Sequence, residues 1–92
     1  MAQQSFEVEL NKLYAPEYMG GIATITAEGG EATLYYLESE TQPTTLAGME
    51  TGLTFRGSRN VKNPPRWVAF SGSATKIVFE NLNPKDSYAD IS

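Results

Sequence analysis

Alternation of hydrophobic and polar residues around a glycine pair is the strongest pattern in this chain. Between Ile22 and Leu37, two alternating runs rich in Thr, Ile and Tyr flank Gly29 and Gly30. The pattern predicts a β-hairpin closed by a two-residue type I′ turn, whose central positions need the positive φ that Gly adopts without steric cost. One face of this hairpin then holds Ala23, Ile25, Ala27, Ala32, Leu34 and Tyr36, and the other holds Thr24, Thr26, Thr33 and Tyr35.

The same logic applies to a second stretch, Arg66 to Phe79. Gly72-Ser73 suits a type II′ turn, in which Gly takes the first central position. The predicted register pairs Val68 with Ile77 and Phe70 with Thr75. It gathers Val68, Phe70, Ile77 and Phe79 on one hydrophobic face and Trp67, Ala69, Lys76 and Val78 on the other.

Two further strands are indicated by shorter patterns. Residues 5–10 alternate, with Phe6, Val8 and Leu10 on one face and Glu7 and Glu9 on the other. The charged outer face is typical of an edge strand, because charge discourages edge-to-edge aggregation. Residues 46–55 predict a turn and then a short strand with Leu53 and Phe55 inward. Residues 11–21, 38–45 and 57–65 contain Gly or Pro and are predicted to be connections.

Together these elements predict the fold class. About six short strands without a helical period indicate an all-β protein, a small antiparallel β-sandwich or barrel with two tight hairpins. We expect residues 1–92 to form a single β domain with short N-terminal and C-terminal (about 83–92) tails.

Charge is distributed unevenly along the chain. The total is 7 basic against 11 acidic residues, a net charge of −4, which argues against general nucleic-acid binding. Residues 1–50 carry eight Glu against Lys12, a net of −7, and residues 51–92 carry six Lys or Arg against three acidic residues, a net of +3. Such asymmetry serves either head-to-tail contact between copies or charge pairing within one fold.

The composition removes several kinds of chemistry. Without Cys or His, the chain has no thiolate nucleophile, no disulfide and no imidazole base or ligand. Glu28 and Glu31 would face each other across the first turn, either as a perturbed carboxylate pair or as a solvated one. Asp86 and Asp90 do not match a calcium loop. We therefore expect no enzyme, no cofactor and no metal site. No apolar run reaches the length of a membrane span, and no signal peptide is expected.

Two segments are candidates for contact with a partner. Residues 11–21 are unusually apolar for a connection and either cap the core or form a contact surface. Residues 56–66 place four basic residues close to Trp67, either as a solvated loop or as a site for a phosphate, an acidic glycan or an acidic patch on a partner. The candidate interface residues are Tyr14, Tyr18, Met19, Arg56, Arg59, Lys62, Arg66, Trp67 and Tyr88.

One part of the chain resembles a known class of proteins. The run Leu46-Ala-Gly-Met-Glu-Thr-Gly-Leu-Thr-Phe55, a Pro-containing loop, and then Arg66-Trp-Val-Ala-Phe-Ser-Gly-Ser-Ala-Thr-Lys-Ile-Val-Phe79 resemble the end of small β-domains in virion proteins of tailed bacteriophages. In those domains a Gly turn and a strand lead into a hairpin of the form W-V-x-x-S-G-S-A-T. The resemblance implies a capsid-decoration, head–tail or tail accessory protein that is oligomeric and not catalytic, and it assigns no binding residue.

The functional prediction follows from these points. We expect a structural or interaction protein that docks on copies of itself or on a larger assembly, such as a phage particle, through protein–protein contacts and without a membrane or nucleic acid. One alternative is a small module that binds a glycan or anionic ligand through Trp67, Tyr35 and the basic loop. Another is an inhibitor of a host protein. The expected location is the virion if the protein derives from a phage, and otherwise the cytoplasm.

Overall fold

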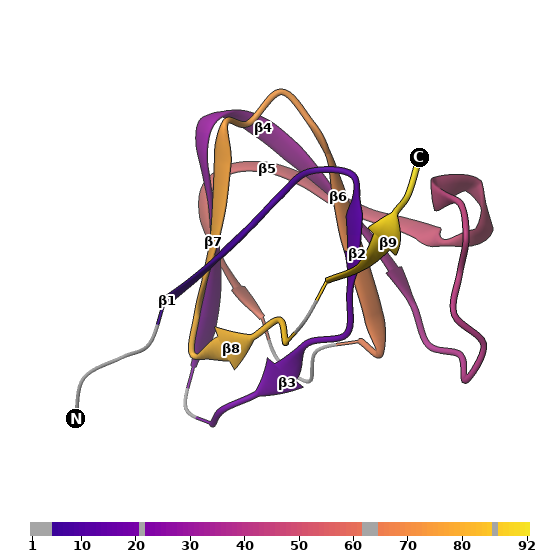
Figure 1. Cartoon of the computed structure of the whole chain (residues 1–92). Coiled ribbons are helices and arrows are strands. Elements are labelled where there is room, and N and C mark those ends of the chain that lie inside the picture. The colour runs from indigo at the N-terminus through magenta and orange to yellow at the C-terminus, as the bar shows by residue number, and fades with distance from the viewer. Residues whose placement is uncertain (1–4, 21, 62–64, 86) are drawn as a thin grey trace.

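The structure is a computed structural model that describes residues 5–20, 22–61, 65–85 and 87–92, with the side chains of residues 87–89 excepted. These residues form strands and one short 3₁₀ helix (Figure 1). The elements are β1 (Ser5–Val8), β2 (Lys12–Tyr14), β3 (Glu17–Tyr18), β4 (Ala23–Leu37), η1 (Leu46–Gly48), β5 (Glu50–Val61), β6 (Trp67–Gly72), β7 (Lys76–Glu80), β8 (Leu82–Asn83) and β9 (Ser87–Asp90). All strand pairs are antiparallel, and the main sheet curls into a half-barrel. The predicted all-β fold class is confirmed.

The first predicted hairpin is wrong, because its two halves form the single 15-residue strand β4. Gly29 does have a positive φ of 78°, but the chain bends there instead of reversing. Between Ala27 and Ala32, β4 advances five residues while its partner β5 advances only two, from Gly57 to Phe55. This bulge shifts the alternation by one residue. The hydrophobic face was therefore predicted almost correctly, with Ala23, Ile25, Ala27 and Ala32 buried in one core cluster and Leu34 packed against it.

The second predicted hairpin is also wrong in its pairing. Strands β6 and β7 both pair with β4, from Trp67 opposite Leu37 to Gly72 opposite Ala32, and then from Lys76 opposite Glu28 onward. The link between them follows the bend of β4, since Ser73 and Ala74 donate their backbone N–H groups to the Glu31 carbonyl oxygen at 3.0 and 2.9 Å. Strands β6 and β7 thus pair with β4 on either side of its bend.

Strand β4 divides the sheet into two parts that share it. Its first half lies between β7 and β5, and β1 pairs with β7 as the edge that the sequence predicted. Its second half lies between β6 and β5, and β2 and β9 continue from β6. Strands β3 and β8 form a small separate sheet at the lower end in Figure 1.

Several segments predicted as connections are strands. Residues 11–21 include β2 and β3, and residues 57–61 are the second half of β5. The predicted C-terminal tail contains β9, whose backbone pairs with β2, and Ile91 after it is buried. Leu53 was predicted to point inward, but it is 47% exposed at an irregularity where β5 advances three residues and β4 two. Residues 38–45 form a connection, as predicted.

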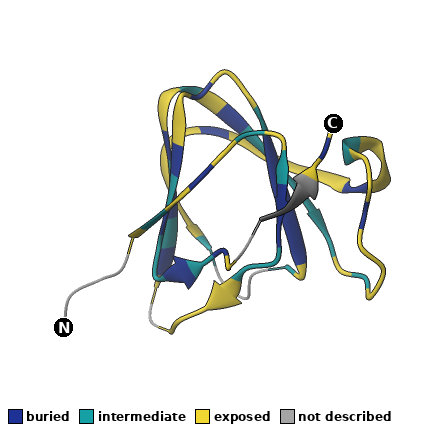
Figure 2. Cartoon of the chain, in the orientation of Figure 1, coloured by how far each residue is buried: buried dark blue, intermediate teal, exposed yellow. Residues whose placement is uncertain are grey.

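The hydrophobic core consists of two clusters (Figure 2). The larger lies inside the half-barrel and includes Phe55, Phe70 and Phe79, whose rings pack edge to face with centroids 6.4 and 5.7 Å apart. The smaller lies on the other face of β6, which alternates between the two. Its buried residues are Leu13, Met49, Trp67, Ala69 and Ile91. The Leu46 N–H donates to the Ser92 carbonyl oxygen at 3.0 Å, so the 38–49 connection and the C-terminus meet over this second cluster.

Candidate functional site

Two of the predicted interface residues are core residues. Tyr14 is 5% exposed, and its hydroxyl oxygen accepts a hydrogen bond from the Glu9 N–H at 2.8 Å. Burial raises the pKa of this hydroxyl. Trp67 is 7% exposed in the second cluster, and its Nε1–H donates to the Ser39 carbonyl oxygen at 2.9 Å. Trp67 was predicted to lie at the surface, and the structure corrects that placement, whereas the burial of Tyr14 matches the alternative in which residues 11–21 cap the core.

The burial of Trp67 bears on the glycan alternative. A sugar ring stacks on an exposed aromatic face, and Trp67 was the aromatic that this alternative required. Tyr35, its proposed neighbour, packs against the same buried cluster. Of the two aromatics, Trp67 is therefore a core residue and Tyr35 is partly buried beside it.

The first part of the predicted basic loop, residues 57–61, is strand. Arg56 and Arg59 lie on strand β5, Arg66 directly precedes β6, and Lys62 falls outside the described residues. Arg59 is opposite Ile25 near one end of β4, whereas Trp67, next to Arg66, is opposite Leu37 at the other end.

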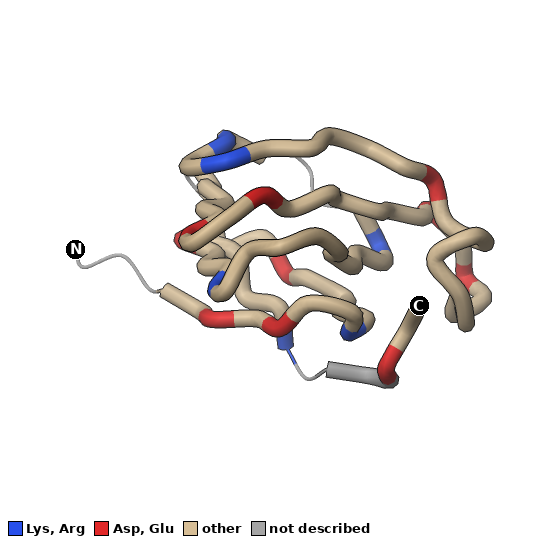
Figure 3. Tube along the Cα trace, turned by 90° about the horizontal axis from the view of Figure 1, so that it is seen from above, with Lys and Arg blue, Asp and Glu red and all other residues tan. Residues whose placement is uncertain are grey.

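Arg56 and Arg59 have separate partners. Arg56 Nε lies 3.6 Å from Glu31 Oε2, and Arg59 Nη1 donates to the Ser58 carbonyl oxygen at 2.9 Å. The Lys and Arg positions lie at several separate places in the molecule (Figure 3). The fold does not gather these arginines into one anion site.

The predicted carboxylate pairs are also dispersed. Glu28 lies opposite Lys76 across β4 and β7, and Glu31 pairs with Arg56, so the two carboxylates do not face each other across a turn. Asp90 forms an ion pair with Lys12 at 2.9 Å, which raises the pKa of Lys12, and Asp86 is outside the described residues. In the described part of the chain, no group of three or more acidic residues is placed to hold a metal ion.

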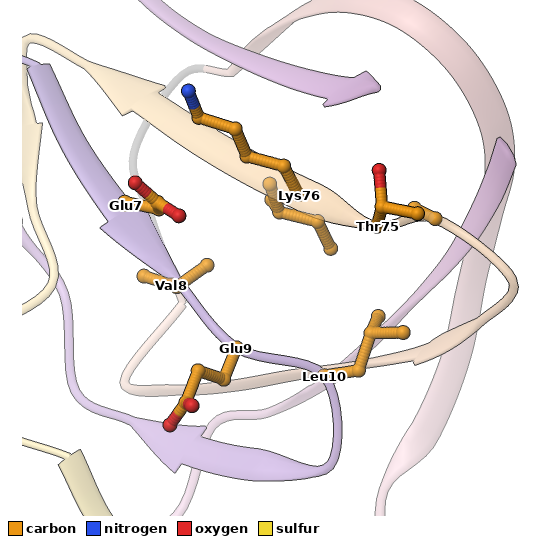
Figure 4. A pocket seen from close by; sticks show the side chains of 8 residues that line it. Glu7, Val8, Glu9, Leu10, Thr75 and Lys76 are labelled. Carbon is orange, nitrogen blue, oxygen red and sulfur yellow. The ribbon is translucent and has the colours of Figure 1, made fainter. Parts of the chain in front are cut away.

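An open cleft of about 370 Å³ lies where β1 separates from β7 (Figure 4). The last β1–β7 pair is Val8 opposite Ile77, and the chain then turns away through Glu9 and Leu10. The floor is formed by buried core residues, and the charged side chains stand at the rim. The lining residues are Glu7, Val8, Glu9, Leu10, Ala74, Thr75, Lys76 and Ile77. The cleft is thus a notch left by two diverging strands.

Exposed apolar residues mark a different part of the molecule. Within the described residues, four large hydrophobic side chains are exposed, and three of them lie within five positions of one another. Tyr18 is 37% exposed, Met19 46% and Ile22 67%. We call these three residues the end surface, because they lie at the end of the half-barrel that carries β3 and β8 (Figures 1 and 2).

Hydrogen bonds hold the end surface in place. Tyr18 is opposite Leu82 in the β3–β8 pair, and the Met19 N–H donates to the Asn81 carbonyl oxygen at 3.2 Å. The Asn81 side-chain Nδ2 donates to the Ile22 carbonyl oxygen at 3.0 Å. Asn81 therefore forms hydrogen bonds with both Met19 and Ile22.

The sequence predicted part of this surface. Tyr18 and Met19 were named as contact residues, and they are exposed as expected. Ile22 was missed because it begins a run of alternating residues and was assigned to the predicted hairpin. Tyr88 lies on β9, but its side chain is outside the described part of the structure.

Comparison with known proteins returned no match: no family profile, curated protein or solved structure resembles this chain at a significant level. Among the described residues, no helix is long and apolar enough to cross a membrane.

Proposed function

We propose that this protein is a non-catalytic structural protein that docks on a larger protein assembly through the end surface. The observation that carries the proposal is the grouping of Tyr18, Met19 and Ile22, all exposed, on one hydrogen-bonded segment. Exposed hydrophobic side chains that gather in one place are typical of sites of protein–protein contact. Tyr and Met are also enriched at such interfaces.

The hydrogen bonds at Met19 and Ile22 support the same function. Ordering flexible side chains and loops on binding consumes part of the binding free energy. Here Asn81 already holds the backbone on both sides of Gly20 through hydrogen bonds. A partner would therefore meet Met19 and Ile22 at backbone positions that are already hydrogen-bonded.

The class of assembly is proposed from the sequence resemblance. The W-V-x-x-S-G-S-A-T pattern of Trp67 to Thr75 resembles virion domains of tailed bacteriophages, which implies a decoration or accessory protein located in the virion. In such a role, the end surface would contact the particle and the rest of the half-barrel would face neighbouring molecules.

The test compares surface variants in the natural setting. The triple variant Tyr18→Ser, Met19→Ser, Ile22→Ser removes the end surface, and Leu53→Ser, which alters the fourth exposed hydrophobic residue on β5, is the matched control. Each protein is added to an extract of the cells or particles that naturally contain it, and the extract is fractionated by size.

We expect the wild type and Leu53→Ser to elute with a particle of high mass and the triple variant to elute as free chain. Circular dichroism establishes that all variants are folded. A triple variant that stays bound would overturn the proposal. So would a wild-type chain that elutes free, or one that forms a small one-to-one complex with a host protein, which is the behaviour of an inhibitor.

A further inference from the structure

Strands β1 and β5 are the two opposite edges of one regular four-stranded sheet. Across the order β1, β7, β4, β5, the pairs align in unbroken rows. One row is Phe6, Phe79, Ile25 and Arg59, and the next is Glu7, Val78, Thr26 and Ser58. Within the described residues, β1 pairs only with β7 and β5 only with β4, so each has one unpaired edge.

The two edges carry opposite charge. Strand β5 contains Arg56 and Arg59 in its second half and one acidic residue, Glu50, at its first position, whereas residues 5–10 contain Glu7 and Glu9 and no basic residue. Arg56 and Glu9 are both exposed. In Figure 3 the blue positions of β5 and the red positions of the segment that follows the N-terminus lie on opposite sides of the molecule. A second copy therefore presents a complementary edge to each free edge of the first.

We infer that copies of this chain join head to tail, with β1 of one copy adding to the free edge of β5 in the next. The even number of strands in this sheet allows the added strand to pair in the antiparallel direction. Because four strands alternate in direction, a copy in the same orientation places its β1 antiparallel to the neighbouring β5. The outer face of one sheet then continues as the outer face of the next, and the backbone groups of both edges gain partners.

The register of the rows specifies the side-chain contacts. Extending each row across the junction places Ser58 opposite Glu7 of the second copy, and the last row places Gly57 opposite Val8 of the second copy. Arg56 and Glu9 are the next residues beyond that last row, so their opposite charges lie together at the end of the junction, where they attract each other. Arg59 falls opposite Phe6 of the second copy, where a guanidinium can stack on an aromatic ring. The Arg56–Glu31 contact inside the chain is 3.6 Å and exposed, so it leaves the guanidinium accessible.

The predicted junction is short, and its length determines the strength of association. Edge segments of four or five residues bury little area, so association should be weak, dependent on protein concentration and sensitive to salt. A head-to-tail contact uses two different surfaces, so it builds a ring or an open filament instead of a closed symmetric dimer. The junction does not include the end surface, so this inference and the docking function stand or fail separately.

The test is a charge exchange between the two edges. Arg56→Glu and Glu9→Arg each place like charges across the junction, so each variant alone should associate at least about tenfold more weakly than the wild type. In a 1:1 mixture of the two variants both kinds of junction again pair opposite charges, and association should recover. Lys85→Glu is the control, because it changes the net charge as Arg56→Glu does and breaks an exposed ion pair with Glu17, and neither residue belongs to β1 or β5.

Association is measured by sedimentation velocity from micromolar to millimolar protein, at low salt and at about 0.5 M NaCl, where charge screening is strong. Amide hydrogen exchange at high protein concentration should slow in residues 57–61 and 5–8. A wild-type chain that is monomeric at every concentration would overturn the inference. A mixture of variants that associates no better than either variant alone would also overturn it.

Discussion

Aromatic side chains illustrate how placement depends on hydrogen-bond partners. Trp67 and Tyr14 each have a polar atom that can be buried only with a partner. Ser39 and Glu9 supply those partners from connecting segments of the backbone. By contrast, Tyr18 extends from the two-stranded β3–β8 sheet, where it is 37% exposed. Residue type alone therefore did not separate core aromatics from surface aromatics.

Replacement of Tyr14 by Phe tests the buried hydroxyl. The Glu9 N–H would lose its hydrogen bond, so we expect a loss of about 1 kcal/mol in the free energy of unfolding at pH 7. Burial raises the pKa of Tyr14 above the value of about 10 for an exposed tyrosine. The folded state then holds the proton more tightly, so the stability due to this group is complete below pH 10 and is lost as the pH rises through the folded-state pKa.

Urea unfolding at pH 7, 9 and 10.5 measures both effects. The wild type should lose more stability between pH 9 and 10.5 than Tyr14→Phe loses, because the variant has no proton to release at this position. Equal losses in the two proteins would contradict the assignment of a raised pKa to Tyr14. Tyr18→Phe, at an exposed tyrosine, is the control.

At the scale of elements, glycine has two uses that look alike in a sequence. A pair of glycines can close a two-residue turn or let a strand bend against a close neighbour. Here the second use applies, since a Cβ at Gly30 would lie 2.6 Å from the Ser73 carbonyl oxygen. Gly72, on the neighbouring strand, meets the Glu31 backbone in the same way and has a φ of 130°. The glycines of both predicted turns thus allow two bent strands to stay in contact.

Gly30→Ala should destabilise the fold through this contact. The added methyl group would meet backbone atoms that cannot move independently, and we expect a cost of about 1–3 kcal/mol, as for overpacking in a core. Gly48→Ala is the matched control, because its nearest neighbour is the Thr45 hydroxyl at 3.4 Å. Thermal unfolding followed by circular dichroism compares the two. Equal melting temperatures for both variants would show that no close approach exists at Gly30.

At the scale of the whole molecule, β4 couples the two core clusters. Its first half contributes Ala23, Ile25 and Ala27 to the larger cluster, and its second half packs Tyr35 and Leu37 against the smaller one. Strand β6 also alternates between them, with Val68 in one and Trp67 in the other. Neither cluster can lose its packing without disturbing a strand of the other, so we expect one cooperative unfolding transition.

Matched aliphatic truncations test this coupling. Leu13→Ala removes a fully buried side chain from the smaller cluster and Ile77→Ala from the larger, and each should cost about 2–5 kcal/mol. Trp67 is the only Trp in the chain and reports from the smaller cluster. In both variants the fluorescence and far-UV circular dichroism midpoints in urea should shift together. An Ile77→Ala variant with an unchanged Trp67 midpoint would show that the clusters unfold independently.

The sequence by itself determined the fold class and most of the buried residues. Alternation assigns Ile25, Phe70 and Ile77 to a buried face because the free energy of burial depends on the chemistry of each side chain. It also identified β1 as a charged edge strand and Tyr18 and Met19 as exposed apolar residues. These are local properties, and they hold whichever strands become neighbours.

Only the tertiary structure decided which strands pair. Gly29-Gly30 and Gly72-Ser73 are compatible with turns or with bends, and the choice depends on whether the flanking strands find better partners elsewhere. In this fold β5 pairs along both halves of β4, and β6 and β7 fill its other side, so β4 has no need to pair with itself. The same pairing placed Arg56 and Arg59 on a free edge opposite β1 and buried Trp67. These placements depend on contacts between residues far apart in the chain, which alternation along a single strand does not specify.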